Sequence, residues 1–350
     1  MAAANTSYNY SAVFAKCRAK SATLLKFEDY HAMAAMKNVS EVASYLDQNS
    51  DYADVLQDAN IIEIHRAELE ALLYENLFKT YKSLYIFTNG ELREFIGAMM
   101  RKYNIDVILR IARNLTSSVD EKRSDDNDRV IITVAHTELN MPKISAAQNL
   151  EQLGEALAGT RYYKSYKNSF ISGKLNYGIL EVNLYNEYYN LIYTKFVEKK
   201  NTTSAKSIQK LLYLMTDLIN LTTIMRLKIS FNAKADKIIP YLLSIRSGRN
   251  KREYIVLSNM SNEDFMEYLR KTAYNKQVSI DARISTSDYI NNYLYIYYRK
   301  LMISATPSFE HPFAYLSLKE IEIKNLIHII EGVRYNITEE KIMDKIIIKH

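Results

Sequence analysis

The sequence predicts an all-α protein built from three homologous helical domains, and three observations carry this prediction. The chain has 350 residues but only 8 glycines and 4 prolines. Because tight turns depend on these two residue types, their scarcity argues against sandwiches, barrels and Gly-rich phosphate loops. Apolar residues recur at the spacing of one helix face. Finally, the same helical elements follow one another in the same order three times.

The last helical element of each copy carries a short repeated pattern. It consists of Asn, an aliphatic residue, two variable residues, two apolar residues and a polar one, and it starts at Asn104, Asn220 and Asn325. Asn is a middling helix former, and a buried polar side chain needs a hydrogen-bond partner. We therefore interpret these three residues as structural.

Two further elements precede each Asn at nearly constant distances. The nearer one places apolar or aromatic residues at i, i+4 and i+8, on one face of a helix: Leu69, Leu73 and Leu77; Leu184, Tyr188 and Ile192; Tyr289, Tyr293 and Tyr297. The farther one is a short helical segment at residues 39–46, 150–157 and 262–269, each followed by a tyrosine, at Tyr52, Tyr162 and Tyr274.

The length of the repeat indicates whole domains. Solenoid repeats span about 20 to 50 residues, whereas this unit spans roughly 110. We therefore predict helical repeat domains at residues 1–120, 121–245 and 246–350. The joins at 117–129 and 240–252 are polar or basic, which is typical of solvated linkers. Residues 129–134 have the composition of a short strand, but the sequence shows no partner strand for them.

Composition and motifs limit the function. The chain has 46 Lys and Arg residues against 40 Asp and Glu residues. This mild excess of positive charge permits contact with an acidic partner, but the sequence shows no dense basic patch of the kind that nucleic-acid binders carry. The single cysteine, Cys17, excludes an intramolecular disulfide and a cysteine-based zinc site. No leader-like N-terminus and no apolar stretch of about 18 to 20 residues appears, so we expect a soluble chain without a membrane span.

Catalytic signatures are missing from the sequence. The six histidines form no HExxH pair, and there is no phosphate loop, GxGxxG or GxSxG motif. We therefore expect no catalytic residue, no cofactor and no metal, and we place Cys17 and His328 in the packing. Residues 161–167 interleave basic and aromatic side chains as a single-strand binder does. The helical spacing of the other tyrosines favours half-buried helix faces instead.

The order, length and triplication of these segments match a known family. Residues 10–25, the three helical copies, residues 315–332 and residues 337–342 resemble the C subunit of the A/V-type rotary ATPases, the counterpart of the eukaryotic V-ATPase d subunit. The resemblance covers essentially the full length. The chain departs from the family in being rich in Tyr and poor in Gly. It also carries Glu331 where the other copies have Arg110 and Arg226.

The resemblance implies a fold and a role. It implies a pseudo-threefold funnel that acts as a non-catalytic socket on the rotor of the enzyme. The central-stalk subunits D and F would insert on one side, and the membrane proteolipid ring would bind on the other. ATP hydrolysis or synthesis would thereby be linked to proton or sodium transport. The protein would be peripheral, on the cytoplasmic face of the membrane.

Candidate contact residues are basic side chains near the ends of the third helices: Arg110, Arg113, Arg226, Lys228 and Arg334. The ordinary interpretation is that the helix dipole favours solvated basic residues at these ends. Three other functions remain open from the residues alone. These are a helical scaffold for protein partners outside any rotary ATPase, a nucleic-acid module, and an enzyme with an unrecognised site.

Overall fold

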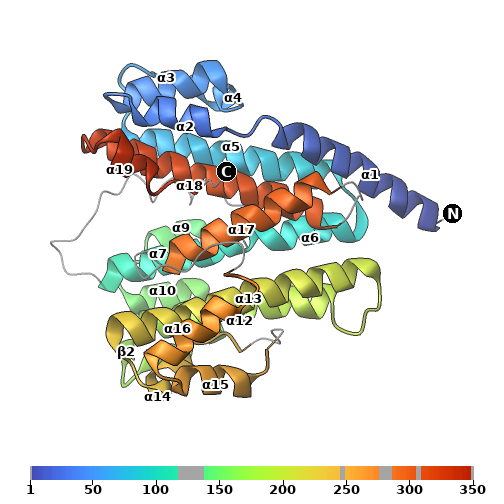
Figure 1. Ribbon diagram of the computed structural model, residues 1–350, viewed down its shortest axis with the longest axis vertical. Helices are drawn as coiled ribbons and strands as arrows, with labels where there is room; N and C mark the ends of the chain where they lie inside the picture. Colours follow the sequence, from blue (N-terminus) through green and yellow to red (C-terminus); the bar gives the residue numbers. More distant parts are fainter. Residues whose placement is uncertain (1, 117–137, 245–248, 276–285, 305–308, 348–350) are drawn as a thin grey trace. The chain divides into compact units, whose positions relative to one another are not determined.

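The structure is a computed structural model that describes residues 2–116, 138–244, 249–275, 286–304 and 309–347 (Figure 1). Helices make up 75% of the chain, which confirms the predicted all-α class. None of the described helices is long and apolar enough to cross a lipid bilayer. The predicted domain boundaries at 120/121 and 245/246 and the strand-like segment at 129–134 lie outside the described residues. The three-domain funnel therefore stays a prediction.

The helices and strands follow one another along the chain in this order. The first ones are α1 (Ala2–Ser21), α2 (Phe27–Ala34), α3 (Val39–Asn49), α4 (Ala53–Leu56), α5 (Arg66–Phe87), α6 (Gly90–Met100) and α7 (Lys102–Thr116). Next come α9 (Met141–Ser145), α10 (Leu150–Leu157), α11 (Tyr162–Lys167), β1 (Phe170–Ile171), β2 (Lys174–Leu175), α12 (Tyr177–Phe196) and α13 (Thr203–Phe231). The last are α14 (Ala235–Ile238), the 3₁₀ turn Ile239–Tyr241, α15 (Lys251–Asn259), α16 (Asn262–Lys271), α17 (Thr286–Ile303), α18 (Glu310–Arg334) and α19 (Glu339–Met343).

Contacts divide the chain into two compact units. Unit 1 comprises Met1–Gly97, Ser124–Ala135 and Leu294–His350, and unit 2 comprises Ala98–Arg123 and His136–Tyr293. The units are defined by contacts, whereas the three copies are defined by sequence similarity. Unit 1 therefore combines the beginning of the first copy with the end of the third.

The core of unit 1 forms around α18. This helix runs beside α5 and also packs against α1, α2, α3 and α19 (Figure 1). It is surrounded by neighbours and has buried residues on several sides, among them Tyr315, Leu316, Leu326 and Ile330. A helix that is apolar on most sides is stable only inside such a bundle.

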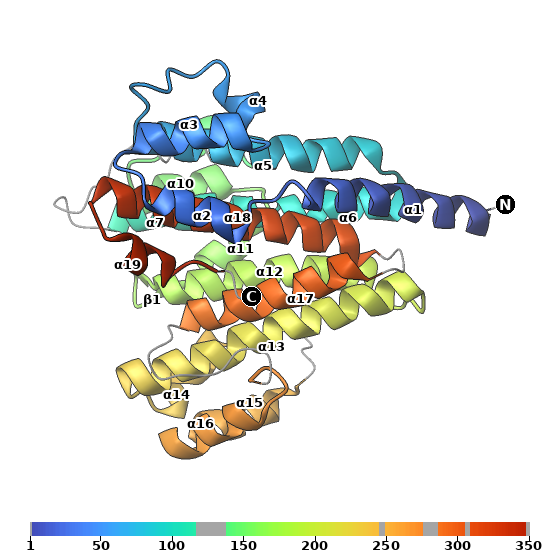
Figure 2. The same cartoon turned by 45° about the horizontal axis from the view of Figure 1, so that its top comes forward.

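The core of unit 2 forms around α12 and α13. Helix α12 packs on α7, α11 and α13, and α15 and α16 lie against α13 (Figure 2). The predicted faces are the buried ones, since Leu184, Tyr188 and Ile192 are all at most 7% exposed. The same holds in unit 1 for the predicted face of α5.

Helices α3, α10 and α16 begin where the sequence predicted the farther repeated segment, and each begins with a capping side chain. Such a side chain accepts a hydrogen bond from a backbone N–H that has no partner in the first turn. Asn38 accepts from Glu41 N, Asn149 from Gln152 N, and Ser261 from Asp264 N. The repeat is therefore present in the local geometry as well as in the sequence.

One short hairpin was not predicted. Strands β1 and β2 pair antiparallel with Phe170 opposite Leu175. The two residues between the strands, Ser172 and Gly173, both have positive φ, at 50° and 77°. This is the conformation that two-residue hairpins favour, because its twist matches that of the strands.

Candidate interface residues

The three repeated Asn residues lie inside the packing. Asn220 Nδ2 donates to Leu243 O at 3.1 Å, and Leu243 N donates back to Asn220 Oδ1 at 2.7 Å. Asn325 makes the same two bonds with Ile347, at 3.3 and 2.9 Å. Asn104 Nδ2 donates to Tyr162 Oη at 3.0 Å. At most 2% of each Asn is exposed, so each side chain satisfies groups that water does not reach.

The tyrosine that follows α3, α10 or α16 bonds to the helix that carries the repeated Asn in the preceding copy, with the third copy preceding the first. Tyr162 Oη accepts from Asn104 of the first copy at 3.0 Å, Tyr274 Oη donates to Asp217 of the second at 2.5 Å, and Tyr52 Oη donates to Glu322 of the third at 2.9 Å. We call these three contacts the joints. Two lie within unit 2 and one lies within unit 1.

A charged residue three positions before each Asn also bonds to the following copy, and in the second and third copies it is the residue that accepts from the joint tyrosine. Arg101 Nη2 pairs with Glu138 Oε1 at 2.5 Å, and Asp217 Oδ1 accepts from Arg249 Nε at 2.8 Å. Glu322 Oε2 accepts from Leu25 N at 2.6 Å. The charge differs in sign between copies, but in each case the partner belongs to the start of the following copy.

The joint in unit 1 contains a buried lysine. Lys319 is 0% exposed, and its Nζ lies 2.7 Å from Asp51 Oδ1 and 2.8 Å from Glu322 Oε1. It also lies 3.9 Å from the centre of the Tyr52 ring. Burial, followed by the Glu322 and Asp51 charges, raises the pKa of Tyr52 well above its ordinary value, so this hydroxyl stays protonated and donates.

The predicted contact residues divide into exposed and internal ones. Arg113, Arg226 and Arg334 are exposed, and Arg110 is half-buried. They lie on three helices, α7, α13 and α18, and their forming one interface stays a prediction. Arg113 Nη2 donates to Tyr177 Oη at 2.7 Å, which holds that guanidinium against α12.

Lys228 is the internal one. Only 6% of it is exposed, and its Nζ donates to Ser258 O at 3.0 Å and to Met260 O at 2.6 Å. These carbonyls lie at the C-terminal end of α15, where helix carbonyls lack intrahelical partners. Lys228 therefore caps α15, and its contact with a partner stays a prediction. Burial lowers the pKa of its ammonium group.

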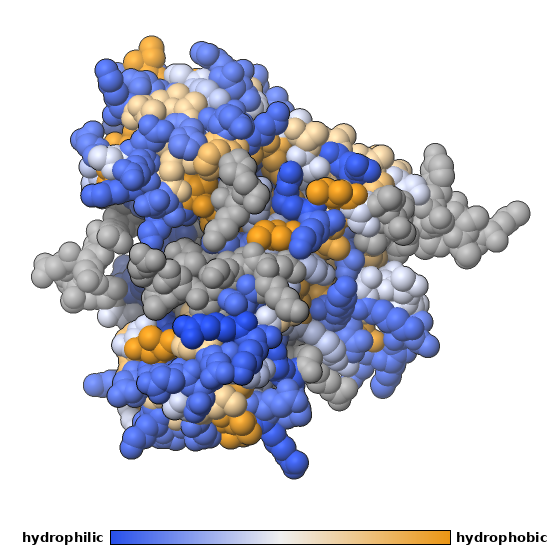
Figure 3. Space-filling model, in the orientation of Figure 1, coloured by the Kyte–Doolittle hydropathy of each residue, from blue (hydrophilic) through white to orange (hydrophobic). Residues whose placement is uncertain are grey.

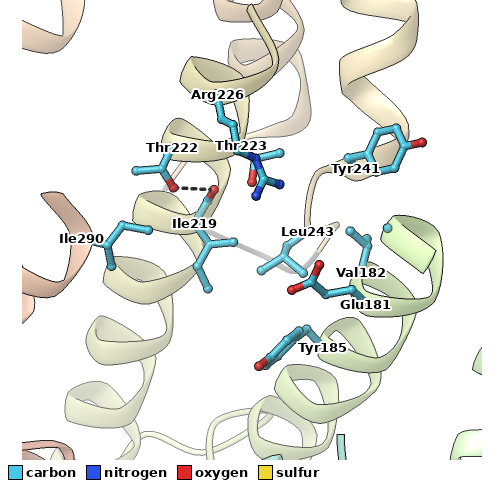
Figure 4. A pocket seen from close by; sticks show the side chains of 11 residues that line it. Glu181, Val182, Tyr185, Ile219, Thr222, Thr223, Arg226, Tyr241, Leu243 and Ile290 are labelled. Carbon is cyan, nitrogen blue, oxygen red and sulfur yellow. Dashed lines mark hydrogen bonds between the residues drawn. The ribbon is translucent and has the colours of Figure 1, made fainter. Parts of the chain in front are cut away.

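Arg226 lines a cavity of about 300 Å³ in unit 2. From α12 and α13, the charged groups of Glu181 and Arg226 extend toward the same space, whose wall includes Val182 and Leu243 (Figure 4). Both charged side chains are exposed, and no ion pair within the described residues joins them. The cavity thus places a cation and an anion at the edge of an apolar depression.

The residue at which the third copy differs from the other two, Glu331, forms an ion pair within unit 1. Glu331, which stands where the other copies have Arg, pairs its Oε1 with Arg66 Nη2 at 2.8 Å within unit 1. Arg66 also contacts Glu70 one turn along α5, at 2.5 Å. The acidic residue thus matches a local basic neighbour.

The reactive side chains of the described residues form no metal site and include no activated thiol. No group of three or more His, Cys, Asp or Glu is placed to hold a metal ion there. Cys17 is buried, and burial raises the pKa of its thiol to about 12. On the face shown in Figure 3, the most hydrophobic residues lie in small, separate patches among hydrophilic ones.

Sequence reasoning missed the joint residues Asp217, Glu322 and Lys319. One signal was present, because the position three before each Asn is charged in every copy. The residue at this position is basic in the first copy (Arg101) and acidic in the other two, so a search for identical residues does not find the pattern. The buried Lys319 carries no such signal.

Comparison with known proteins identifies the family. Residues 13–345 match the family model described as ATP synthase (C/AC39) subunit. The chain is 26% identical to the C subunit of the A-type ATP synthase of Methanococcoides burtonii, over 98% of this chain and 95% of that protein. It is 25% identical to the corresponding C subunits of Methanosarcina acetivorans, covering 97% and 93%, and Thermococcus kodakarensis, covering 91% and 84%. The chain belongs to the ATP synthase (C/AC39) subunit family.

Proposed function

We propose that this chain is the non-catalytic rotor subunit of an A/V-type ATPase. It acts as a socket that couples the central stalk, subunits D and F, to the membrane proteolipid ring. The observation that carries this proposal is the match to ATP synthase C subunits across nearly the whole chain. Through this coupling, ATP hydrolysis or synthesis is linked to proton or sodium transport.

The proposal includes a pseudo-threefold funnel of three domains. The three joints support it, because they repeat the same relation between one copy and the next, including the step from the third copy back to the first. Joints of this kind also suit a part that transmits torque. Closely packed helices tied by buried polar bonds resist deformation.

The proposal places the protein on the cytoplasmic face, where it is held by its partners rather than by a span of its own. The contact residues that we propose are Arg226, Arg334, Arg110 and Arg113. Lys228 is left out because its ammonium group bonds to two carbonyls at the end of α15. Arg226 carries the most support, since its guanidinium is exposed beside an apolar cavity. Partner surfaces of matching charge steer such contacts and fix their register.

Rotation of the chain itself tests this proposal. Cys17 is the only cysteine and is buried, so a thiol introduced by Ile62→Cys, at a position that is 85% exposed, takes a biotin label specifically. The complex is immobilised through its catalytic sector, and a bead is attached to the labelled site. Unlabelled wild-type chain in the same complex controls for attachment of beads elsewhere.

We expect the bead to turn in one direction when ATP is added and to stop with a non-hydrolysable analogue. A bead that stays fixed while the complex hydrolyses ATP would place the chain on the stator and contradict the rotor proposal. Failure of the chain to join the complex at all would favour the scaffold alternative.

A further inference from the structure

A groove of about 660 Å³ lies within unit 1, between the α1–α2 connection and the second half of α17. Its apolar wall includes Leu24, Phe27 and Ile296, all half-buried, and Ile303 at the end of α17, which is 70% exposed. Apolar area left in water costs about 25 cal/mol per Å². A partner that covers this wall therefore gains free energy of binding.

The edge of the groove is basic. Lys26, Arg299 and Lys300 line it and are exposed, against one carboxylate, Glu28. No ion pair joins their charged groups to another described residue. Two more cations, Arg18 and Lys20, lie in the last turn of α1. The groove thus offers positive charge that the described part of the chain leaves unneutralised.

Hydrogen bonds to buried and half-buried carboxylates fix the α1–α2 connection, which forms one wall of the groove. Leu25 N donates to the buried carboxylate of Glu322 at 2.6 Å, and Lys26 N donates to Asp29 Oδ2 at 2.6 Å. Asp29 in turn accepts from Tyr45 Oη at 2.8 Å. Because these bonds fix the α1–α2 connection before any ligand arrives, binding costs little ordering of this segment.

We propose that this groove binds an acidic segment of a partner polypeptide that inserts apolar side chains between the basic residues. The cations match acidic side chains, and the apolar wall matches the apolar face of an amphipathic helix. A flat membrane surface would contact the basic edge and leave the apolar wall of the groove uncovered. The inference goes beyond the rotor role and does not depend on it.

The test uses the purified full-length chain and a defined probe. The probe is a blocked, fluorescein-labelled helical peptide of about 15 residues made of Ala, Leu and Glu, with Leu along one face and Glu on both sides. Binding is followed by fluorescence anisotropy. A second peptide has Gln in place of every Glu. Vesicles containing phosphatidylglycerol are tested separately for binding of the chain.

The variant pair separates the groove from general charge effects. Arg299→Glu with Lys300→Glu reverses the edge of the groove. Lys206→Glu with Lys210→Glu makes the same change of net charge on an exposed face of α13 in unit 2. Arg299→Gln with Lys300→Gln serves as the milder pair if the reversal affects folding, which circular dichroism monitors.

We expect the Glu peptide to bind the wild-type chain and the α13 control alike. Affinity should fall about tenfold or more in the groove variant, and by a similar factor for the Gln peptide. It should also fall as salt rises, since the Debye length is about 10 Å at 0.1 M. Equal binding by wild type and groove variant would overturn the proposal. Binding of vesicles but not of peptide, abolished by the same variant, would also overturn it and assign the groove to a membrane.

Discussion

At the scale of single residues, Arg226 and Lys228 show how helix geometry separates two similar side chains. They lie two positions apart on α13, and therefore about 200° apart around its axis. Arg226 reaches the cavity edge, whereas Lys228 bonds two carbonyls at the end of α15. From the sequence, both look like solvated basic residues near a helix end.

This pair gives a prediction with an internal control. Arg226→Glu should leave the free energy of unfolding within about 0.5 kcal/mol of wild type, because the residue is exposed, but should weaken binding of the stalk subunits. Lys228→Met should lower the free energy of unfolding by about 1–3 kcal/mol, because it leaves the carbonyls of Ser258 and Met260 unpaired. It should leave the affinity for the stalk subunits unchanged. Denaturant unfolding and a stalk-binding assay measure both. Arg226→Glu with unchanged stalk affinity would remove this residue from the interface.

The repeated Asn residues give a second prediction. Asn220→Leu keeps the branched shape of the side chain but leaves Leu243 N–H and C=O without partners. We expect a loss of about 1–3 kcal/mol in the free energy of unfolding, with a similar loss for Asn325→Leu. Asn201→Leu, at an exposed position, serves as the control. If the buried and exposed variants lose the same stability, the Asn bonds do not support the fold.

At the scale of elements, the joint in unit 1 connects the segment between α3 and α4 to α18. We expect Lys319→Met to lower stability by about 3–5 kcal/mol, because Glu322 then stays buried without its cation. Adding Glu322→Gln removes that charge and should restore part of the loss. Thermal unfolding followed by circular dichroism compares the two. A Lys319→Met chain as stable as wild type would show that the ion pair contributes nothing to the joint.

The sequence predicted the elements better than the contacts between them. Helix starts at Val39, Leu150 and Asn262 were correct, because a capping side chain and an apolar face act locally. The hairpin was missed because strands of two residues show no alternation of apolar and polar positions. The partners of Asn220 and Glu322 could not be predicted, since they depend on tertiary packing. The capping role of Lys228 was missed for the same reason.

At the scale of the whole molecule, the buried members of the 29 tyrosines make the protein less stable at alkaline pH. Burial raises the pKa of Tyr166 to about 12, and burial followed by the charge of Tyr293 raises that of Tyr289 to about 12. An unfolded tyrosine ionises near pH 10. A raised folded-state pKa means that the contribution to stability is fully present below about pH 10 and is lost as pH rises toward 12.

We therefore expect the unfolding temperature to be nearly constant from neutral pH to about pH 9 and to fall between about pH 10 and 12. Tyrosinate absorbance should rise in two stages, exposed residues first and buried ones on unfolding. Tyr166→Phe and Tyr289→Phe should make the alkaline decrease shallower. A decrease that is unchanged in both variants would mean that these two hydroxyls do not contribute.

The coupling role is tested most directly in membrane vesicles reconstituted with and without the chain, in which ATP hydrolysis and ion uptake are followed together. Without the chain, the catalytic sector should still hydrolyse ATP, while hydrolysis-driven ion uptake should fall to background. Adding back wild-type chain should restore uptake, and adding back the Arg110→Glu, Arg226→Glu double variant should restore less. Ion uptake that continues to follow ATP hydrolysis in vesicles lacking the chain would contradict the account.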